Sequence, residues 1–142
     1  MTNTATLIGP TDIALWETLL WASLDDDGEP LEQRYSVGRF GSVGVDSAAI
    51  AKLSEEFWAW DAQACELMVD RGYGDLSLED LVGEGRAEHC YVLVREGHGV
   101  GTADSWTAGS EQWFLCRELE KLARAQGEIN AYVGDDGRVY TY

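Results

Sequence analysis

The stretch INAYVGDDGRVYTY, residues 129–142, carries the sheet signal that decides the fold class. It contains two runs rich in β-prone residues, Ile129–Val133 and Arg138–Thr141, with Asp136-Gly137 between them. An Asp-Gly pair between such runs is typical of a hairpin turn, because glycine readily adopts the positive φ that the turn requires. We therefore predict an antiparallel hairpin that is closed at Asp136-Gly137.

Three segments upstream of the hairpin have apolar residues at intervals of three and four, the spacing of one helix face. They predict helices over residues 11–24, 47–70 and 111–126. Thr11, Asp46 and Ser110 suit the N-termini of these helices, because their side-chain oxygens can accept hydrogen bonds from first-turn N–H groups. Ser77, followed three residues later by Asp80, predicts a fourth, short helix through residue 82.

Two further segments complete the predicted order of elements. Residues 32–45, EQRYSVGRFGSVGV, have no helical period and three glycines, which predicts an extended loop. Residues 89–96, HCYVLVRE, are rich in Tyr and Val, which predicts a strand. A length of 142 residues suits a single domain over residues 1–142. We predict an α+β domain with helices packed on a small, mainly antiparallel sheet near the C-terminus.

Acidic residues dominate the charge of the chain. Asp and Glu number 26 against 10 Lys and Arg, for a formal net charge of −16 at pH 7. Long-range repulsion then disfavours binding to bare nucleic acid or to an anionic membrane. Two interpretations stay open: an acidic surface that maintains solubility, or an acidic face that docks on a basic partner protein. Net charge bears on solubility before function, which on charge alone favours the first.

Acidic side chains in two segments are the candidate partner-binding groups. The first set crowds the end of the first predicted helix, and the second shares a broad side of the second helix. They are Asp25, Asp26, Asp27 and Glu29, and Glu55, Glu56 and Asp61. Trp58 joins them, because it lies off the helix face defined by Phe57 and Trp60 and is expected to be exposed. Tryptophan is enriched among the residues that dominate binding energy at protein interfaces.

The glycine-rich stretch REGHGVGTADSW, residues 95–106, resembles a cofactor loop only in part. A dinucleotide-binding loop needs a third glycine where this chain has Thr102, and no lysine follows that would make a phosphate-binding loop. His98 could serve as a general base, but no Ser or Cys nucleophile stands at a recognisable spacing. We predict a tight turn over Gly97–Gly101 with at least one positive φ, no catalytic residue and no nucleotide cofactor.

Cysteine and histidine positions predict neither a metal site nor disulfide bonds. The three cysteines have no paired spacing and lie in apolar segments, so we expect buried free thiols. His89 and Cys90 are adjacent and have no further ligands at zinc-site spacing. The N-terminus lacks the pattern of a signal peptide, and no stretch has the length of a membrane span. These features predict a soluble, cytoplasmic protein.

Four motifs together resemble a family of small acidic proteins encoded by tailed bacteriophages. They are the Leu15-Trp16 helix, the DGEPL turn at 27–31, the GHGVG loop at 97–101 and the YVGDDG hairpin at 132–137. The resemblance extends from about Ala14 to Tyr140. The chain departs from the family where FWDR usually follows the glycine loop, since it has TADSW there. The resemblance implies a phage accessory protein that acts in the bacterial cytoplasm.

Charge and resemblance together favour a non-enzymatic inhibitor of a basic host protein. The expected target is a defence or nucleic-acid-processing protein, such as a CRISPR or restriction complex. If the 16 excess charges were arrayed on one face, they would match roughly 27 Å of duplex, about eight base pairs, and so mimic DNA. A structural or regulatory phage protein whose acidity serves solubility is the first alternative. A small enzyme that uses His98 with Asp104 is the second.

Overall fold

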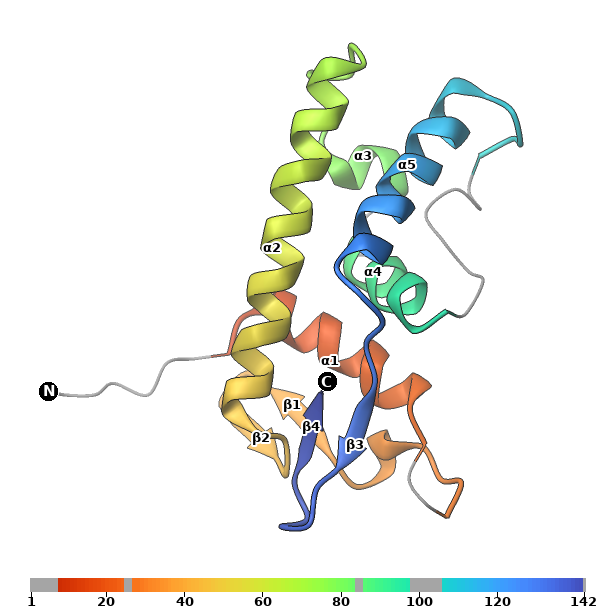
Figure 1. Ribbon diagram of the computed structural model, residues 1–142. Coiled ribbons are helices and arrows are strands. Elements are labelled where there is room, and N and C mark those ends of the chain that lie inside the picture. The colour runs from red at the N-terminus through yellow and green to blue at the C-terminus, as the bar shows by residue number, and fades with distance from the viewer. Residues whose placement is uncertain (1–7, 25–26, 84–85, 98–105, 142) are drawn as a thin grey trace, which may run out of the picture. The chain divides into compact units, whose positions relative to one another are not determined.

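The computed structural model describes residues 8–24, 27–83, 86–97 and 106–141 (Figure 1). Over these residues the chain forms five α-helices, a short 3-10 helix and two antiparallel β-hairpins, which confirms the α+β class. The chain divides into two compact units, one within Met1–Ser54 and Asn130–Tyr142, the other within Glu55–Ile129. A single domain over residues 1–142 stays a prediction.

The first unit contains the predicted C-terminal hairpin. Strand β3 (Ala131–Val133) pairs antiparallel with β4 (Val139–Thr141), with Tyr132 opposite Tyr140 and their rings stacked at 5.9 Å. Gly137 has a φ of 79°, and its N–H donates to the carbonyl of Gly134 at 2.9 Å. The hairpin that was predicted from Asp136-Gly137 is therefore confirmed.

A second hairpin occupies the segment predicted as an extended loop. Strand β1 (Ser36–Gly38) pairs with β2 (Gly41–Val43), after a 3-10 helix η1 at Leu31–Gln33. The loop prediction was wrong here because the sequence signal is weak. Each strand has only three residues, β2 is exposed throughout, and the connecting residues are Arg39 and Phe40 rather than turn formers.

Helix α1 (Pro10–Ala22) begins slightly earlier than predicted. Its N-cap is Gly9 rather than Thr11, because Pro10 at the first helical position already has the φ of a helix. The carboxylate of Asp12 accepts a hydrogen bond from the Gly9 N–H at 3.4 Å. The helix packs on β1 and η1 through a buried face. The apolar residues of that face are Leu15, Trp16, Leu19 and Leu20.

Helix α2 (Ser47–Asp70) begins in the first unit and continues into the second, with the predicted bounds and cap. The Asp46 carboxylate accepts a hydrogen bond from the Ala49 N–H at 3.0 Å. The Asp46 N–H in turn donates to the Val139 carbonyl at 2.9 Å. The core face of the helix runs along its length and consists of Ala49, Ile50, Leu53, Phe57, Trp60, Ala64 and Met68.

The second unit contains three further helices besides its part of α2. Helix α3 (Leu78–Val82) is capped by Ser77, whose hydroxyl accepts from the Asp80 N–H at 3.1 Å. Helix α5 (Glu111–Ala125) is capped by Ser110, whose hydroxyl accepts from the Trp113 N–H at 3.2 Å. Both helices confirm the predictions from the sequence. Helix α4 (Ala87–Glu96) lies between them in the sequence and is drawn in green in Figure 1.

Helix α4 corrects the predicted strand over residues 89–96. The segment from Cys90 to Arg95 is buried at every position. A helix that is buried on all sides shows no polar face, so its apolar run cannot be distinguished from a buried strand by periodicity. Two residues did indicate the ends of a helix. Glu88 is an acidic residue in the first turn, and Gly97 is the C-cap residue, with a φ of 79°.

Gly44→Ala is expected to lower the free energy of unfolding by about 2–3 kcal/mol. Gly44 has a φ of 72°, and an added Cβ would lie 2.6 Å from a ring carbon of Tyr35. The Tyr35 hydroxyl donates to the Gly137 carbonyl at 3.2 Å, so movement of the ring would also disturb the hairpin. Urea denaturation measures the effect.

Gly28→Ala is the control, since Gly28 also has a positive φ but no atom within 4 Å of the added Cβ. We expect the free energy of unfolding to fall by about 1 kcal/mol there. Equal losses in the two variants would contradict the role of the Tyr35 contact.

Candidate partner-binding surface

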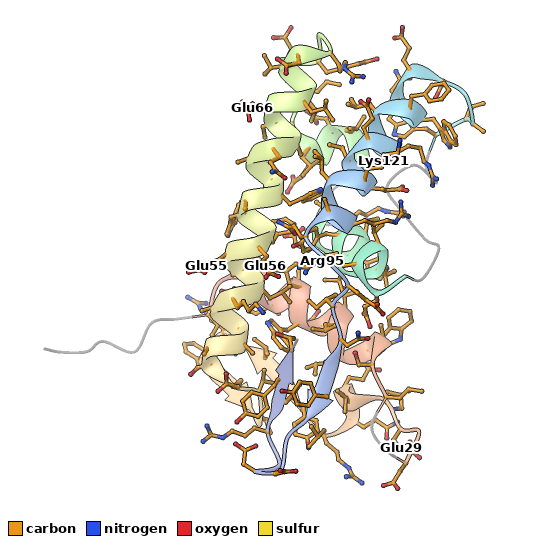
Figure 2. The ribbon with its side chains drawn as sticks, viewed as in Figure 1. Glu29, Glu55, Glu56, Glu66, Arg95 and Lys121 are labelled. Carbon is orange, nitrogen blue, oxygen red and sulfur yellow. The ribbon has the colours of Figure 1, made fainter. Side chains whose placement is uncertain are left out.

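The acidic cluster that follows α1 belongs to the first unit. Asp27 and Glu29 are exposed, and Glu29 is labelled in Figure 2. Asp25 and Asp26 lie outside the described residues. The cluster's role in partner binding stays a prediction.

The predicted cluster on α2 lies in the second unit and separates into different environments. Glu55 is exposed, whereas Asp61 is half-buried, and burial raises the pKa of the Asp61 carboxyl. Glu56 faces the core and forms an ion pair with Arg95 of α4 at 2.6 Å. Figure 2 shows Glu56 directed toward Arg95 and Glu55 on the opposite side of the helix. Of the three, Glu55 is therefore the carboxylate most available to a partner.

Arg95 is the centre of a hydrogen-bond network that holds the second unit together. Its side chain is only 4% exposed. It donates to Glu56, to the Tyr91 hydroxyl at 2.9 Å and to the Gly127 carbonyl at 2.9 Å. The Tyr91 hydroxyl donates to the side chain of Gln126, which donates to the Glu56 carbonyl at 2.7 Å. The Arg95 side chain thus joins α4 to α2 and to the residues that follow α5.

Burial also governs the acidity of Tyr91 in this network. Desolvation raises the pKa of its hydroxyl to about 12, and the nearby Arg95 opposes that rise. A tyrosine with such a pKa is neutral at physiological pH and cannot act as a general base there.

An exposed apolar stripe runs along α2 on the side opposite its core face. Its members are Trp58, Ala62, Cys65 and Val69, which we call the outer stripe. Trp58 is 52% exposed, which confirms the exposure predicted for it, and Val69 is 62% exposed. Cys65 is exposed as well, so the prediction of three buried thiols is wrong for it and confirmed for Cys90 and Cys116.

Carboxylates border the outer stripe. At 100° per residue, Glu55, Glu66 and Asp70 lie along one margin of the stripe and Asp61 along the other. The first three are exposed. Lys52 is the one cationic residue in the sequence of α2. The surface thus combines apolar side chains with a negative border.

A groove between α2 and α5 adjoins this surface within the second unit. Its volume is about 500 Å³, and Leu67 of α2 and Leu122 of α5 provide its apolar lining. Glu66 and Asp70 also line it, so they belong to both the groove and the border of the outer stripe. Lys121 of α5 lies on the far side of the groove, and Figure 2 labels both Glu66 and Lys121. The lining of the groove thus combines apolar side chains with three carboxylates and one lysine.

Of this surface, Trp58, Glu55 and Asp61 were predicted from the sequence, whereas the other members of the outer stripe and the border residues Glu66 and Asp70 were missed. Ala62, Cys65 and Val69 follow Trp58 at intervals of four, three and four residues. That spacing was a usable signal for a second apolar face. The prediction considered only the face that contains Phe57 and Trp60.

The glycine loop contributes little to the described structure. Gly97 has the predicted positive φ, but it follows a helix and not a strand. His98 and Asp104 lie outside the described residues.

In the described part of the chain, no group of three or more His, Cys, Asp or Glu is placed to hold a metal ion. No helix of that same part is both long enough and apolar enough to cross a membrane.

Comparison of the chain with protein-family models, curated proteins and solved structures found no match. The resemblance to tailed-phage proteins therefore stays a prediction.

Proposed function

We propose that this protein is a non-enzymatic binding protein that inhibits a basic host protein by docking on it. One observation supports this most strongly: the outer face of α2 carries an exposed tryptophan in an apolar stripe with a carboxylate border. Indole groups supply much of the binding energy at protein interfaces, and charged borders steer association. Solubility alone would require the carboxylates but not the exposed Trp58 and Val69.

The mixed character of this surface favours a protein partner that is recognised through more than charge. A surface that only imitated duplex DNA would array carboxylates where phosphates lie, without apolar side chains between them. On α2 the apolar residues Trp58 and Val69 stand between acidic residues. The net charge of −16 and the phage-like motifs support a target that itself handles nucleic acid, such as a host defence nuclease or a CRISPR or restriction complex.

A direct test is capture of partners from a bacterial lysate with the tagged protein, followed by reconstitution with the purified partner. We expect to capture a basic protein, and we expect stoichiometric amounts of this chain to block the binding or cleavage of nucleic acid by that protein. Tight binding of the chain to DNA would contradict it. Turnover of a small molecule at a rate abolished by His98→Ala would support an enzyme instead. Failure to capture any basic protein would leave solubility as the role of the acidic surface.

Neutralising carboxylates is expected to slow association with that partner. A triple variant should associate about tenfold more slowly at about 0.05 M salt, because charge steering is lost. It combines Glu55→Gln, Glu66→Gln and Asp70→Asn. The difference should nearly vanish at about 0.5 M salt, where charges are screened over a few ångströms. Stopped-flow or surface-based kinetics measure both rates. The variant Asp25→Asn, Asp26→Asn and Asp27→Asn makes the same charge change and tests the other cluster. If the association rate is the same at both salt concentrations and in both variants, the protein does not dock through an acidic surface.

A further inference from the structure

We propose that the outer stripe of α2 binds an amphipathic helix of the partner that is rich in lysine or arginine. This inference rests on the proposed function and specifies how the partner docks. The stripe residues follow one another in the sequence at intervals of four, three and four positions. They are Trp58, Ala62, Cys65 and Val69. That is the spacing of a coiled-coil seam, where one helix meets another along a narrow apolar line.

The sizes of the stripe residues suit a second helix. The small side chains of Ala62 and Cys65 lie between the large ones of Trp58 and Val69. Small residues in the middle let a second helix approach closely, while the large residues contact it at either end. The stripe covers about 16 Å of helix, which corresponds to about three turns of the partner. A helix surface has no free strand edge, so an extended peptide could not pair with its backbone.

The charges identify the chemistry of the partner helix. In a coiled coil, residues beside the seam face their counterparts on the other helix. Asp61 and Glu66 occupy such flanking positions, and Glu55 and Asp70 add further negative charge. A second copy of this chain would place carboxylates against carboxylates, which disfavours self-association. A helix with lysine or arginine beside its apolar seam is complementary.

The groove between α2 and α5 provides a place for a long basic side chain. The aliphatic part of a lysine or arginine can pack on Leu67 and Leu122, while its charged end reaches Glu66 or Asp70. Glu118, on the other wall of the groove, is already paired with Arg71 at 2.7 Å. The groove thus extends recognition from the outer stripe toward α5.

Binding of a designed helical peptide tests the inference. The probe is a fluorescein-labelled peptide of about three heptads, with leucine at the seam positions and lysine beside them. One control peptide has glutamate in place of lysine, and another has the same composition with the leucines out of register. The lysine peptide should bind at least tenfold more tightly than either control, as measured by fluorescence anisotropy. Equal binding of the scrambled peptide would overturn the proposal, and so would no binding of the lysine peptide.

Variants of the full chain locate the site. Trp58→Ala should weaken binding of the lysine peptide about 30-fold, as expected for the largest aromatic side chain of an interface. Phe114→Ala removes an aromatic side chain that is 58% exposed on α5 and should leave binding within about twofold. Glu66→Gln with Asp70→Asn should weaken it about fivefold at low salt, whereas Asp75→Asn with Glu79→Gln should not. An unchanged affinity in Trp58→Ala would overturn the inference.

The natural partner separates this inference from the proposed function. If capture of a basic protein is salt-sensitive but indifferent to Trp58→Ala, the proposed function stands and the helix site is wrong. If the lysine peptide binds through Trp58 but no basic protein is captured, the site stands and the proposed function is wrong. Concentration-dependent dimerisation that Trp58→Ala abolishes would assign the stripe to a second copy of the chain and overturn the proposed partner.

Discussion

Arg95→Ala is expected to lower the free energy of unfolding by about 3–5 kcal/mol, the usual loss when one partner of a buried ion pair is removed. The substitution leaves the Glu56 carboxylate without its partner at 2.6 Å and the Tyr91 hydroxyl without its donor at 2.9 Å. The Gly127 carbonyl after α5 also loses its bond to the side chain. Urea denaturation followed by circular dichroism measures the change.

A matched substitution at the other end of the ion pair provides the control. Glu56→Gln keeps an oxygen that can accept from Arg95 but leaves the buried guanidinium without a countercharge, so we expect a loss of about 2–3 kcal/mol, smaller than for Arg95→Ala because the hydrogen bonds of Arg95 stay in place. The Glu56 side chain is 29% exposed, and water can compensate part of its change. A loss below about 1 kcal/mol in Arg95→Ala would show that the network contributes little to stability.

Trp60→Ala is expected to cost about 3–5 kcal/mol, as for other large-to-small changes in a core. Trp60 is 1% exposed, its ring lies 5.1 Å from that of Tyr91, and its indole N–H donates to the Leu119 carbonyl at 2.9 Å. Truncation therefore opens a cavity and removes a bond between α2 and α5. The measurement is again denaturation followed by circular dichroism, which does not depend on tryptophan emission.

Trp58→Ala is the natural control for Trp60→Ala, because it makes the same chemical change two residues away on the same helix. Trp58 is 52% exposed, so we expect a loss of less than about 1 kcal/mol. Comparable losses at the two positions would mean that Trp58 is part of the core and would remove it as a candidate contact residue. A small loss at Trp58 would also establish that its variant is folded in the binding experiments.

Local signals predicted much of the fold. The hairpin of β3 and β4 followed from Asp136-Gly137, and the cap residues Asp46, Ser77 and Ser110 located the starts of three helices. These signals work because a turn or cap depends on a few adjacent residues. Helix α4 was missed because burial on all sides erases the polar face by which a helix is recognised in sequence. That information lies in tertiary packing.

The candidate site was less predictable for a similar reason. The exposure of Trp58 could be inferred from its place relative to Phe57 and Trp60 on one helix. The pairing of Glu56 with Arg95 could not be inferred from the sequence, since the two residues are 39 positions apart in the chain. Acidic residues look alike in a sequence, and only the fold separates a carboxylate in an internal network from one on a surface.

The contact of β4 with the start of α2 has a consequence for the order in which the chain folds during synthesis. The Val139 N–H donates to the Gly44 carbonyl at 2.8 Å, so the first unit joins two segments that lie on either side of the second unit in the sequence. The second unit is continuous in sequence, from Glu55 to Ile129. Helix α1 and the β1–β2 hairpin contact each other within residues 10–43 and can pair as soon as they leave the ribosome. The bonds of β4 to Gly44 and Asp46, by contrast, can form only after the whole second unit has been made. The second unit is therefore complete in sequence before the two segments of the first unit can be joined.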